Sequence, residues 1–120
     1  MTFDSIITKE VYETPNCFQQ HTDMPYRYVD VYSGSNVIAR LALGITGNRC
    51  ILHGVARKSS LSALKAFRTA YFSTVVPGLK GMNITTIVAY NFTEDAKWAK
   101  LMKLLDFRDP VTLQYTEMEI

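Results

Sequence analysis

The pattern of apolar and polar positions between residues 26 and 56 predicts three consecutive antiparallel strands. The runs YRYVDVYSG and NVIARLALGIT are rich in β-branched and aromatic residues, and the Gly-Ser-Asn between them is typical of a tight hairpin. A second turn signal, TGN, leads into a third apolar run, RCILHGVA. Short turns of this kind join neighbouring strands, so we expect these runs to lie side by side in one sheet.

The spacing of apolar residues changes after residue 60. From Ser60 to Val76 they recur at steps of three and four, which predicts a helix with one buried face. Lys65 and Arg68 fall off that face, and Pro77-Gly78 is expected to end the helix. The predicted buried face consists of Leu61, Leu64, Phe67, Tyr71, Phe72 and Val75.

The last third of the chain predicts a strand, a helix and a closing strand. NITTIVAYNF shows little alternation, as expected for a central strand covered on both faces. Thr93, followed by two acidic residues, suits a helix start, because its hydroxyl can cap free N–H groups and the acids complement the helix dipole. That helix runs through AKWAKLMKLLDF and ends at Pro110, and VTLQYTEMEI alternates like a strand.

The first 25 residues are the least regular part of the sequence. They indicate a short strand near Phe3 to Thr8, followed by a loop or a short helix. The whole chain then reads β-(irregular)-β-β-β-α-β-α-β. This order predicts a single α/β (α+β) domain over residues 1–120, with a mixed, mainly antiparallel sheet of about six strands flanked by helices.

Composition narrows the function classes. At 120 residues with 48% hydrophobic content, the chain is the size of one ordinary domain. Thirteen Lys and Arg against 11 Asp and Glu give a net charge of only +2, which argues against nucleic acid as a partner and means that any basic site is local. With only two cysteines, Cys17 and Cys50, and no closely spaced set of several Cys and His residues, the sequence supports neither a disulfide framework nor a metal site. The sequence has neither a secretory start nor a membrane-length apolar run, so we expect a cytoplasmic protein without a membrane partner.

One turn carries a local cluster of basic and hydroxyl residues. In ILHGVARKSSLSALKAF, an apolar strand runs into a helix across Arg57, Lys58, Ser59 and Ser60. Backbone N–H groups at such a strand-to-helix turn are suited to holding phosphate. The alternative is an ordinary solvated turn.

The order of elements and this turn together resemble the GNAT superfamily of N-acetyltransferases. In that family the fourth strand, splayed from the fifth, enters a helix through Q/R-x-x-G-x-G/A, whose amides hold the pyrophosphate of acetyl-CoA. Residues 57–62 match as R-x-x-S-x-S, with Ser in place of both glycines. The resemblance covers residues 26–120 and implies these cofactor-binding residues: Val55, Arg57, Lys58, Ser59, Ser60, Ser62 and Asn91.

A second stretch, LMKLLDF at residues 101–107, resembles the family pattern L-Y-E-K-L-G-F. Met102 replaces the Tyr that commonly protonates the departing thiolate, and Met cannot donate a proton. Asp106 replaces the usual Gly at the helix end. In its brevity the chain looks most like the short, divergent GNAT-fold proteins of short-tailed bacteriophages, some of which are virion components.

Amide formation from a thioester requires a base for the amine and a route for protonating the thiolate. The candidate bases are Asp30, His53, Glu117 and Glu119, and His53 is favoured because imidazole ordinarily titrates near neutral pH. Tyr90 and Tyr115 are candidate replacements for the missing acid, with Tyr115 preferred. The alternative for His53 is an ordinary histidine of the sheet.

Two main functions follow from the resemblance. The first is an acetyl-CoA-dependent N-acetyltransferase that acts on a small-molecule or protein amine. The second is a catalytically silent GNAT-fold protein that binds a virion or host protein. A small nucleic-acid-binding domain is a distant third. An exposed sheet edge beside the last strand would also allow a homodimer.

Overall fold

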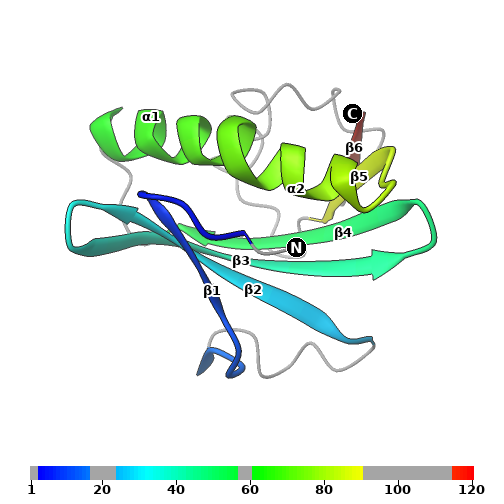
Figure 1. Ribbon diagram of the computed structural model, residues 1–120, viewed down its shortest axis with the longest axis horizontal. Coiled ribbons are helices and arrows are strands. Elements are labelled where there is room, and N and C mark those ends of the chain that lie inside the picture. The colour runs from blue at the N-terminus through cyan, green and yellow to red at the C-terminus, as the bar shows by residue number, and fades with distance from the viewer. Residues whose placement is uncertain (1–2, 17–23, 57–60, 91–114) are drawn as a thin grey trace.

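The computed structural model describes residues 3–16, 24–56, 61–90 and 115–120. These residues form one six-stranded sheet whose strands follow one another in sequence order. Neighbouring strands are antiparallel except β4 and β5, which are parallel, so the predicted mixed, mainly antiparallel α+β fold is confirmed. Helical segments cover one face of the sheet (Figure 1). The strands are β1 (Thr8–Val11), β2 (Tyr26–Ser33), β3 (Asn36–Thr46), β4 (Arg49–Ala56), β5 (Thr86–Tyr90) and β6 (Tyr115–Glu119).

The two predicted hairpins are confirmed. Strands β2 and β3 are joined by Gly34 and Ser35, and β3 and β4 by Gly47 and Asn48. Each loop begins with a glycine in the left-handed region, at φ 62° for Gly34 and 59° for Gly47. Two-residue loops of this kind match the right-handed twist of the strands they connect, which is why local sequence specifies the pairing here.

The N-terminal strand begins later than predicted. The expected strand near Phe3 to Thr8 is instead a turn, and β1 starts at Thr8. Two polar side chains bind the backbone of this segment: Asp4 Oδ1 accepts from the Glu10 N–H at 2.8 Å, and Ser5 Oγ accepts from the Thr8 N–H at 3.1 Å. Such bonds compete with strand pairing, so the first turn is set by Asp4 and Ser5.

The helix predicted from Ser60 to Val76 is present but does not end at Pro77. Segment α1 (Leu61–Ala70) passes through a π-helical turn, η2 (Tyr71–Val75), into α2 (Val76–Gly81). The Val76 N–H donates to the Tyr71 carbonyl across this turn, and Pro77 stands in the first turn of α2. A proline there removes no α-helical hydrogen bond, so the chain continues past it.

The helix ends at an asparagine. Asn83 adopts a left-handed φ of 63°, and the N–H groups of Asn83 and Ile84 donate to the carbonyls of Lys80 and Leu79 at 3.0 and 3.1 Å. This is the Schellman arrangement, in which Asn is tolerated because its short polar side chain suits the left-handed conformation. The strand predicted from residue 83 therefore begins only at Thr86.

The core lies between the helical layer and the sheet. As predicted, Phe67, Tyr71 and Val75 are buried, whereas Lys65 and Arg68 are exposed. Leu64 and Phe72 are only half-buried, whereas the small residues Ala63 and Ala70 are buried. The fully buried side chains include Val29, Val31, Leu41 and Leu43 from the sheet and Tyr71, Val75 and Leu79 from the helix.

Strand β5 is central, as predicted. It pairs with β4 on one side and β6 on the other, and Ile87, Val88 and Ala89 are each at most 1% exposed. The helix predicted from Thr93 and the segment that contains Cys17 lie outside the described residues. Among the helices that are described, none has the length and apolar character needed to cross a membrane.

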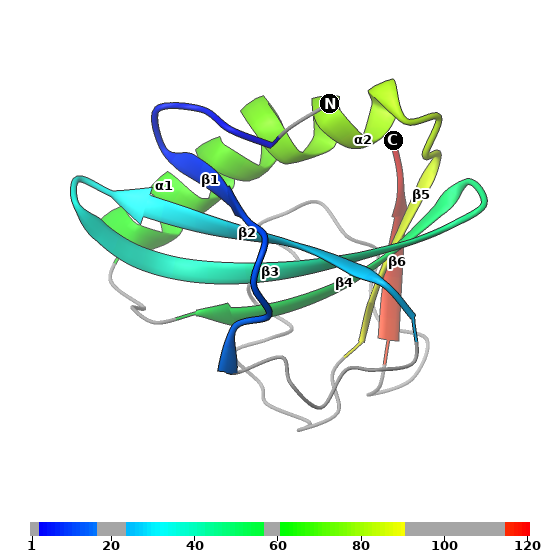
Figure 2. The same ribbon diagram turned by 60° about the horizontal axis from the view of Figure 1, so that its bottom comes forward.

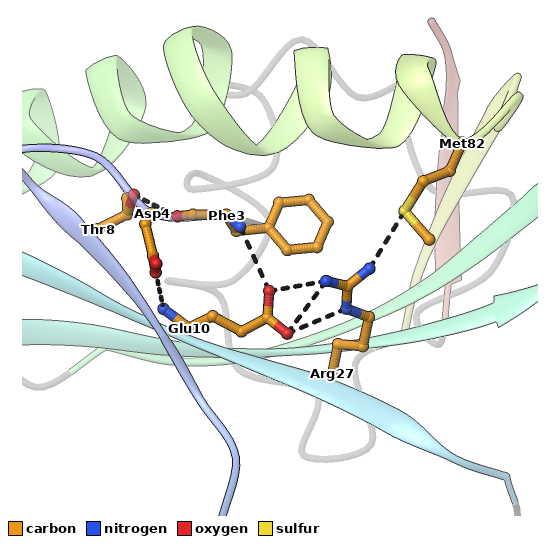
Figure 3. A network of polar contacts seen from close by, with 6 residues as sticks. All are labelled: Phe3, Asp4, Thr8, Glu10, Arg27 and Met82. Carbon is orange, nitrogen blue, oxygen red and sulfur yellow. Dashed lines mark hydrogen bonds and ion pairs between the residues drawn. The ribbon is translucent and has the colours of Figure 1, made fainter. Parts of the chain in front are cut away.

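The N-terminal segment contacts both the helical layer and the sheet, through the Phe3 ring and the Glu10–Arg27 ion pair (Figure 3). Phe3 is fully buried and lies so close to α2 that a Cβ on Gly78 would be 2.5 Å from Phe3 Cε1. The guanidinium carbon of Arg27 lies 4.8 Å from the centre of the Phe3 ring. Glu10 accepts from Arg27 Nη2 at 2.8 Å and Nε at 3.1 Å, and from the Phe3 N–H at 3.3 Å. Arg27 Nη1 also lies 3.5 Å from Met82 Sδ.

The burial of Cys50 leads us to expect that the protein becomes less stable at alkaline pH. Desolvation by burial raises the pKa of the Cys50 thiol to about 12 from an ordinary 9.0. Above the ordinary value the unfolded chain loses this proton while the folded protein keeps it, so stability falls as pH rises. Between pH 8 and pH 10.5 we expect denaturant unfolding to lose about 2 kcal/mol more in the native sequence than in Cys50→Ala. Equal losses in the two proteins would contradict this.

Candidate functional site

Strands β4 and β5 separate part of the way along their length. Arg49 to Leu52 of β4 pair with Thr86 to Ala89 of β5, after which β4 continues to Ala56 beside β3. Figure 2 shows β5 and β6 turning away from β4. Gly54 and Val55 therefore have no β5 register partner in the described part of the chain. This is the place where β4 leads towards the start of α1.

The candidate residues of β2 and β4 lie on the face of the sheet opposite the helices. Directly paired residues of an antiparallel ladder share one face. Asp30 pairs with Arg40, Arg40 with Val55, and Ala42 with His53. The alternate positions, such as Leu41, belong to the core beneath the helices. The fold thus brings Asp30, His53 and Val55 to one face.

His53 is held by an aromatic partner that the sequence analysis did not identify. Its side chain is only 9% exposed, and its Nε2 lies 3.3 Å from the hydroxyl of Tyr26. The two rings meet edge to face, with centroids 5.5 Å apart. Tyr26 on β2 reaches His53 on β4 by crossing β3 at Gly44, where a Cβ would be 2.7 Å from Tyr26 Cε1. The glycine therefore makes room for the ring.

Asp30 is engaged in an ion pair. Its Oδ1 accepts from Arg40 Nε at 3.1 Å, and the Asp30 side chain is 8% exposed against 32% for Arg40. A carboxylate held by a guanidinium in this way has a charged partner of its own. The arrangement favours a structural and orienting role for Asp30 over that of the base.

The remaining catalytic candidates come from β5 and β6. The β5–β6 register pairs Tyr90 with Tyr115, so Tyr115 is separated from β4 by β5. Glu117 pairs with Val88, and Glu119 is exposed at the end of β6. Val55, at 38%, is among the exposed large apolar residues, and Ser62 is exposed in the first turn of α1. Five predicted cofactor-binding residues lie outside the described part: Arg57, Lys58, Ser59, Ser60 and Asn91.

Two features of the sequence could have indicated the missed residues. Gly44 interrupts an otherwise apolar strand, and a glycine in such a place often marks a close approach by another group. Arg40 is a charge within the same strand, opposite an acidic residue of the neighbouring strand once the hairpin register is assumed. Over the residues described, no three His, Cys, Asp or Glu side chains are grouped so as to hold a metal ion.

Comparison with known proteins gives similarity at the level of structure. No family model matches the sequence, and no curated protein matches it. Among solved structures, the Bacillus subtilis acetyltransferase in complex with CoA is similar, with a TM-score of 0.66 at 9% identity over 95% of this chain and 98% of that one. The ribosomal-protein-S18-alanine N-acetyltransferase of Escherichia coli gives a TM-score of 0.61 at 11% identity, over 87% and 75% of the two chains.

The Campylobacter jejuni N-acetyltransferase PseH in complex with acetyl coenzyme A is similar over 84% of this chain and 72% of that one, with a TM-score of 0.53 at 20% identity. These identities are low, so the likeness concerns the backbone arrangement. The chain described here has the fold of the GNAT N-acetyltransferases.

Proposed function

We propose that this chain is an acetyl-CoA-dependent N-acetyltransferase that binds its acetyl donor where β4 separates from β5. The observation that carries the proposal is the end of the β4–β5 ladder at Leu52, with β4 continuing for four residues towards α1. An extended strand edge of this kind can offer backbone N–H and C=O groups to an extended ligand. The similarity to structures with bound CoA or acetyl-CoA supports the choice of donor.

The residues around this edge fit such a ligand. Gly54 and Val55 are exposed on β4, and the first turn of α1 contains no acidic residue that would repel phosphate. In the proposal, the turn at residues 57–60 and Ser62 hold the pyrophosphate through backbone N–H groups, hydroxyls and the Arg57 and Lys58 charges. Asn91 is assigned to the same ligand through the family resemblance.

The bound donor supplies a thioester carbonyl, and the residues of the chain must handle two protons from the acceptor ammonium. In the proposal His53 accepts the first proton, so that the neutral nitrogen can attack the carbonyl carbon. The N–C bond forms and the C–S bond breaks. The second proton ends on the departing thiolate, with the Tyr115 hydroxyl as the proposed relay. The acceptor is a small-molecule or protein amine.

Transfer of labelled acetyl groups tests this function. Incubation with acetyl-CoA labelled in the acetyl group and a panel of amines should give a labelled amide product. Ser60→Glu should abolish transfer, because it places a negative charge against the pyrophosphate. Ser73→Glu is the matched control, since it adds the same charge at an exposed site further along the helix. Transfer that is equally active in both variants would refute the proposed pyrophosphate site.

Absence of transfer to every amine would instead favour the catalytically silent alternative. The likeness to phage GNAT-fold proteins, the virion or host-protein partner, the homodimer and the cytoplasmic location all stay predictions. The acetyltransferase is preferred because the described part of the fold retains a strand edge for the donor and a buried histidine beside it.

A further inference from the structure

A second polar group lies next to His53 on the same face of the sheet. The strand registers place Lys9, Asp30, Arg40 and Val55 side by side across β1 to β4. This row contains two cations and one carboxylate, so it carries an excess positive charge. The adjacent row contains His53. An excess of positive charge close to the proposed base is suited to an anionic group on the substrate.

The ion pair with Asp30 orients Arg40 but engages only part of its guanidinium group. Only its Nε is engaged, by Asp30 Oδ1 at 3.1 Å, and within the described residues its Nη1 and Nη2 have no recorded partner. Asp30 is the buried member of the pair, whereas about a third of the Arg40 side chain is exposed, at 32%. A guanidinium carries five N–H donors in a planar fork. The buried carboxylate therefore anchors one part of the fork and leaves the terminal N–H groups for a ligand.

The spacing between Arg40 and His53 limits the size of that ligand. Arg40 pairs with Val55, and His53 stands two residues before Val55 on the same strand. Arg40 and His53 are therefore diagonal neighbours, which are roughly 7–8 Å apart in an antiparallel ladder. One small molecule can place an amine at the imidazole and an anionic group at the guanidinium.

We infer that Arg40 binds a carboxylate of the acceptor, and that the acceptor is a small amine that carries a carboxylate, as a free amino acid does. This inference rests on the proposed acetyltransferase function. A phosphate of the donor could reach the same guanidinium, because Val55, the neighbour of Arg40, leads towards the pyrophosphate turn. The experiment therefore separates a carboxylate on the acceptor from a phosphate on the donor.

Binding is tested first, without any turnover. The Arg Nε–H resonances are followed by nitrogen-15 NMR while N-acetylalanine, a product of the inferred reaction, is added to the protein. The Arg40 resonance, assigned from Arg40→Lys, should move with N-acetylalanine and stay in place with N-acetylalaninamide, which lacks the carboxylate. If the Arg40 resonance moves with neither compound, the inferred carboxylate site is wrong, whatever the catalytic activity.

Kinetics then distinguish the two sources of the anion. Arg40→Lys keeps the charge but removes the fork, and it should raise KM for alanine about 10- to 100-fold while KM for acetyl-CoA is unchanged. The double variant Asp30→Asn/Arg40→Gln leaves no buried carboxylate unpaired and should show the same loss. A rise in KM for acetyl-CoA instead would assign Arg40 to a donor phosphate and overturn the inference. An NMR response in a protein that acetylates no amine would refute the acetyltransferase and leave the carboxylate site standing.

Discussion

Replacing Phe3 with alanine should lower the free energy of unfolding by about 3–5 kcal/mol. The ring is fully buried between α2 and the Arg27 guanidinium, so its removal leaves a cavity and takes away a cation–π contact. Because whole domains are stable by only about 5–15 kcal/mol, such a loss should be visible as a large fall in the midpoint of denaturant unfolding. A change below about 1 kcal/mol would mean that the N-terminal turn is not fastened to the helix.

Gly78→Ala supplies a control, because its effect on the free energy of unfolding should depend on whether the Phe3 ring is present. In the native sequence the new Cβ would lie 2.5 Å from the Phe3 ring, and overpacking of this kind costs about 1–3 kcal/mol. In the Phe3→Ala background the same methyl group enters the cavity and alanine is the better helix former, so the change should be neutral or stabilising. An equal cost in both backgrounds would contradict the described contact between these two residues.

Replacing His53 with glutamine should lower kcat for acetyl transfer about 10²- to 10⁴-fold if His53 is the base. Glutamine can still hydrogen-bond to the Tyr26 hydroxyl but cannot accept a proton at neutral pH. The affinity for acetyl-CoA should be unchanged, because the proposed donor site uses the backbone of β4 and the following turn. The variant should also lose the acidic limb of the pH profile of kcat, because a glutamine amide cannot take up the proton that inactivates a general base.

Tyr26→Phe distinguishes the role of His53 as the base from the role of Tyr26 in positioning it. The variant keeps the imidazole but loses the hydroxyl that lies 3.3 Å from its Nε2. We expect a smaller fall in kcat than in His53→Gln, with the acidic limb of the pH profile retained, because the imidazole is still present. A His53→Gln protein that folds normally and keeps its kcat would identify His53 as an ordinary histidine of the sheet.

The sheet could be predicted from the sequence because its signals are local. Strands β2, β3 and β4 follow their apolar runs residue by residue, and each hairpin glycine stands at the first position of a two-residue loop. The predicted end of the helix was wrong, because whether a proline such as Pro77 ends a helix depends on the turn that precedes it. A π-helical turn at residues 71–75 places that proline in a first turn, and no periodicity of apolar residues reveals this.

The candidate site was predictable only one residue at a time. His53 could be chosen for its chemistry, but its partner Tyr26 is 27 residues away in the sequence. The contact between their side chains also depends on Gly44, because a Cβ at that position would collide with the Tyr26 ring. Arg40 and Asp30 are joined by the register of one hairpin, which the sequence indicates but does not fix. The N-terminal turn was missed for a similar reason, because Phe3, Arg27 and Gly78 meet only in the folded protein.

The most direct measurement is a calorimetric titration of acetyl-CoA into the purified protein, with Arg57→Ala and Lys80→Ala alongside. Each variant removes one positive charge, and Lys80 is an exposed residue of α2, so it serves as the matched control. We predict micromolar binding, about −8 kcal/mol, that weakens about 10-fold or more in Arg57→Ala and is unchanged in Lys80→Ala. No heat of binding and no change in melting temperature at millimolar acetyl-CoA would contradict the account.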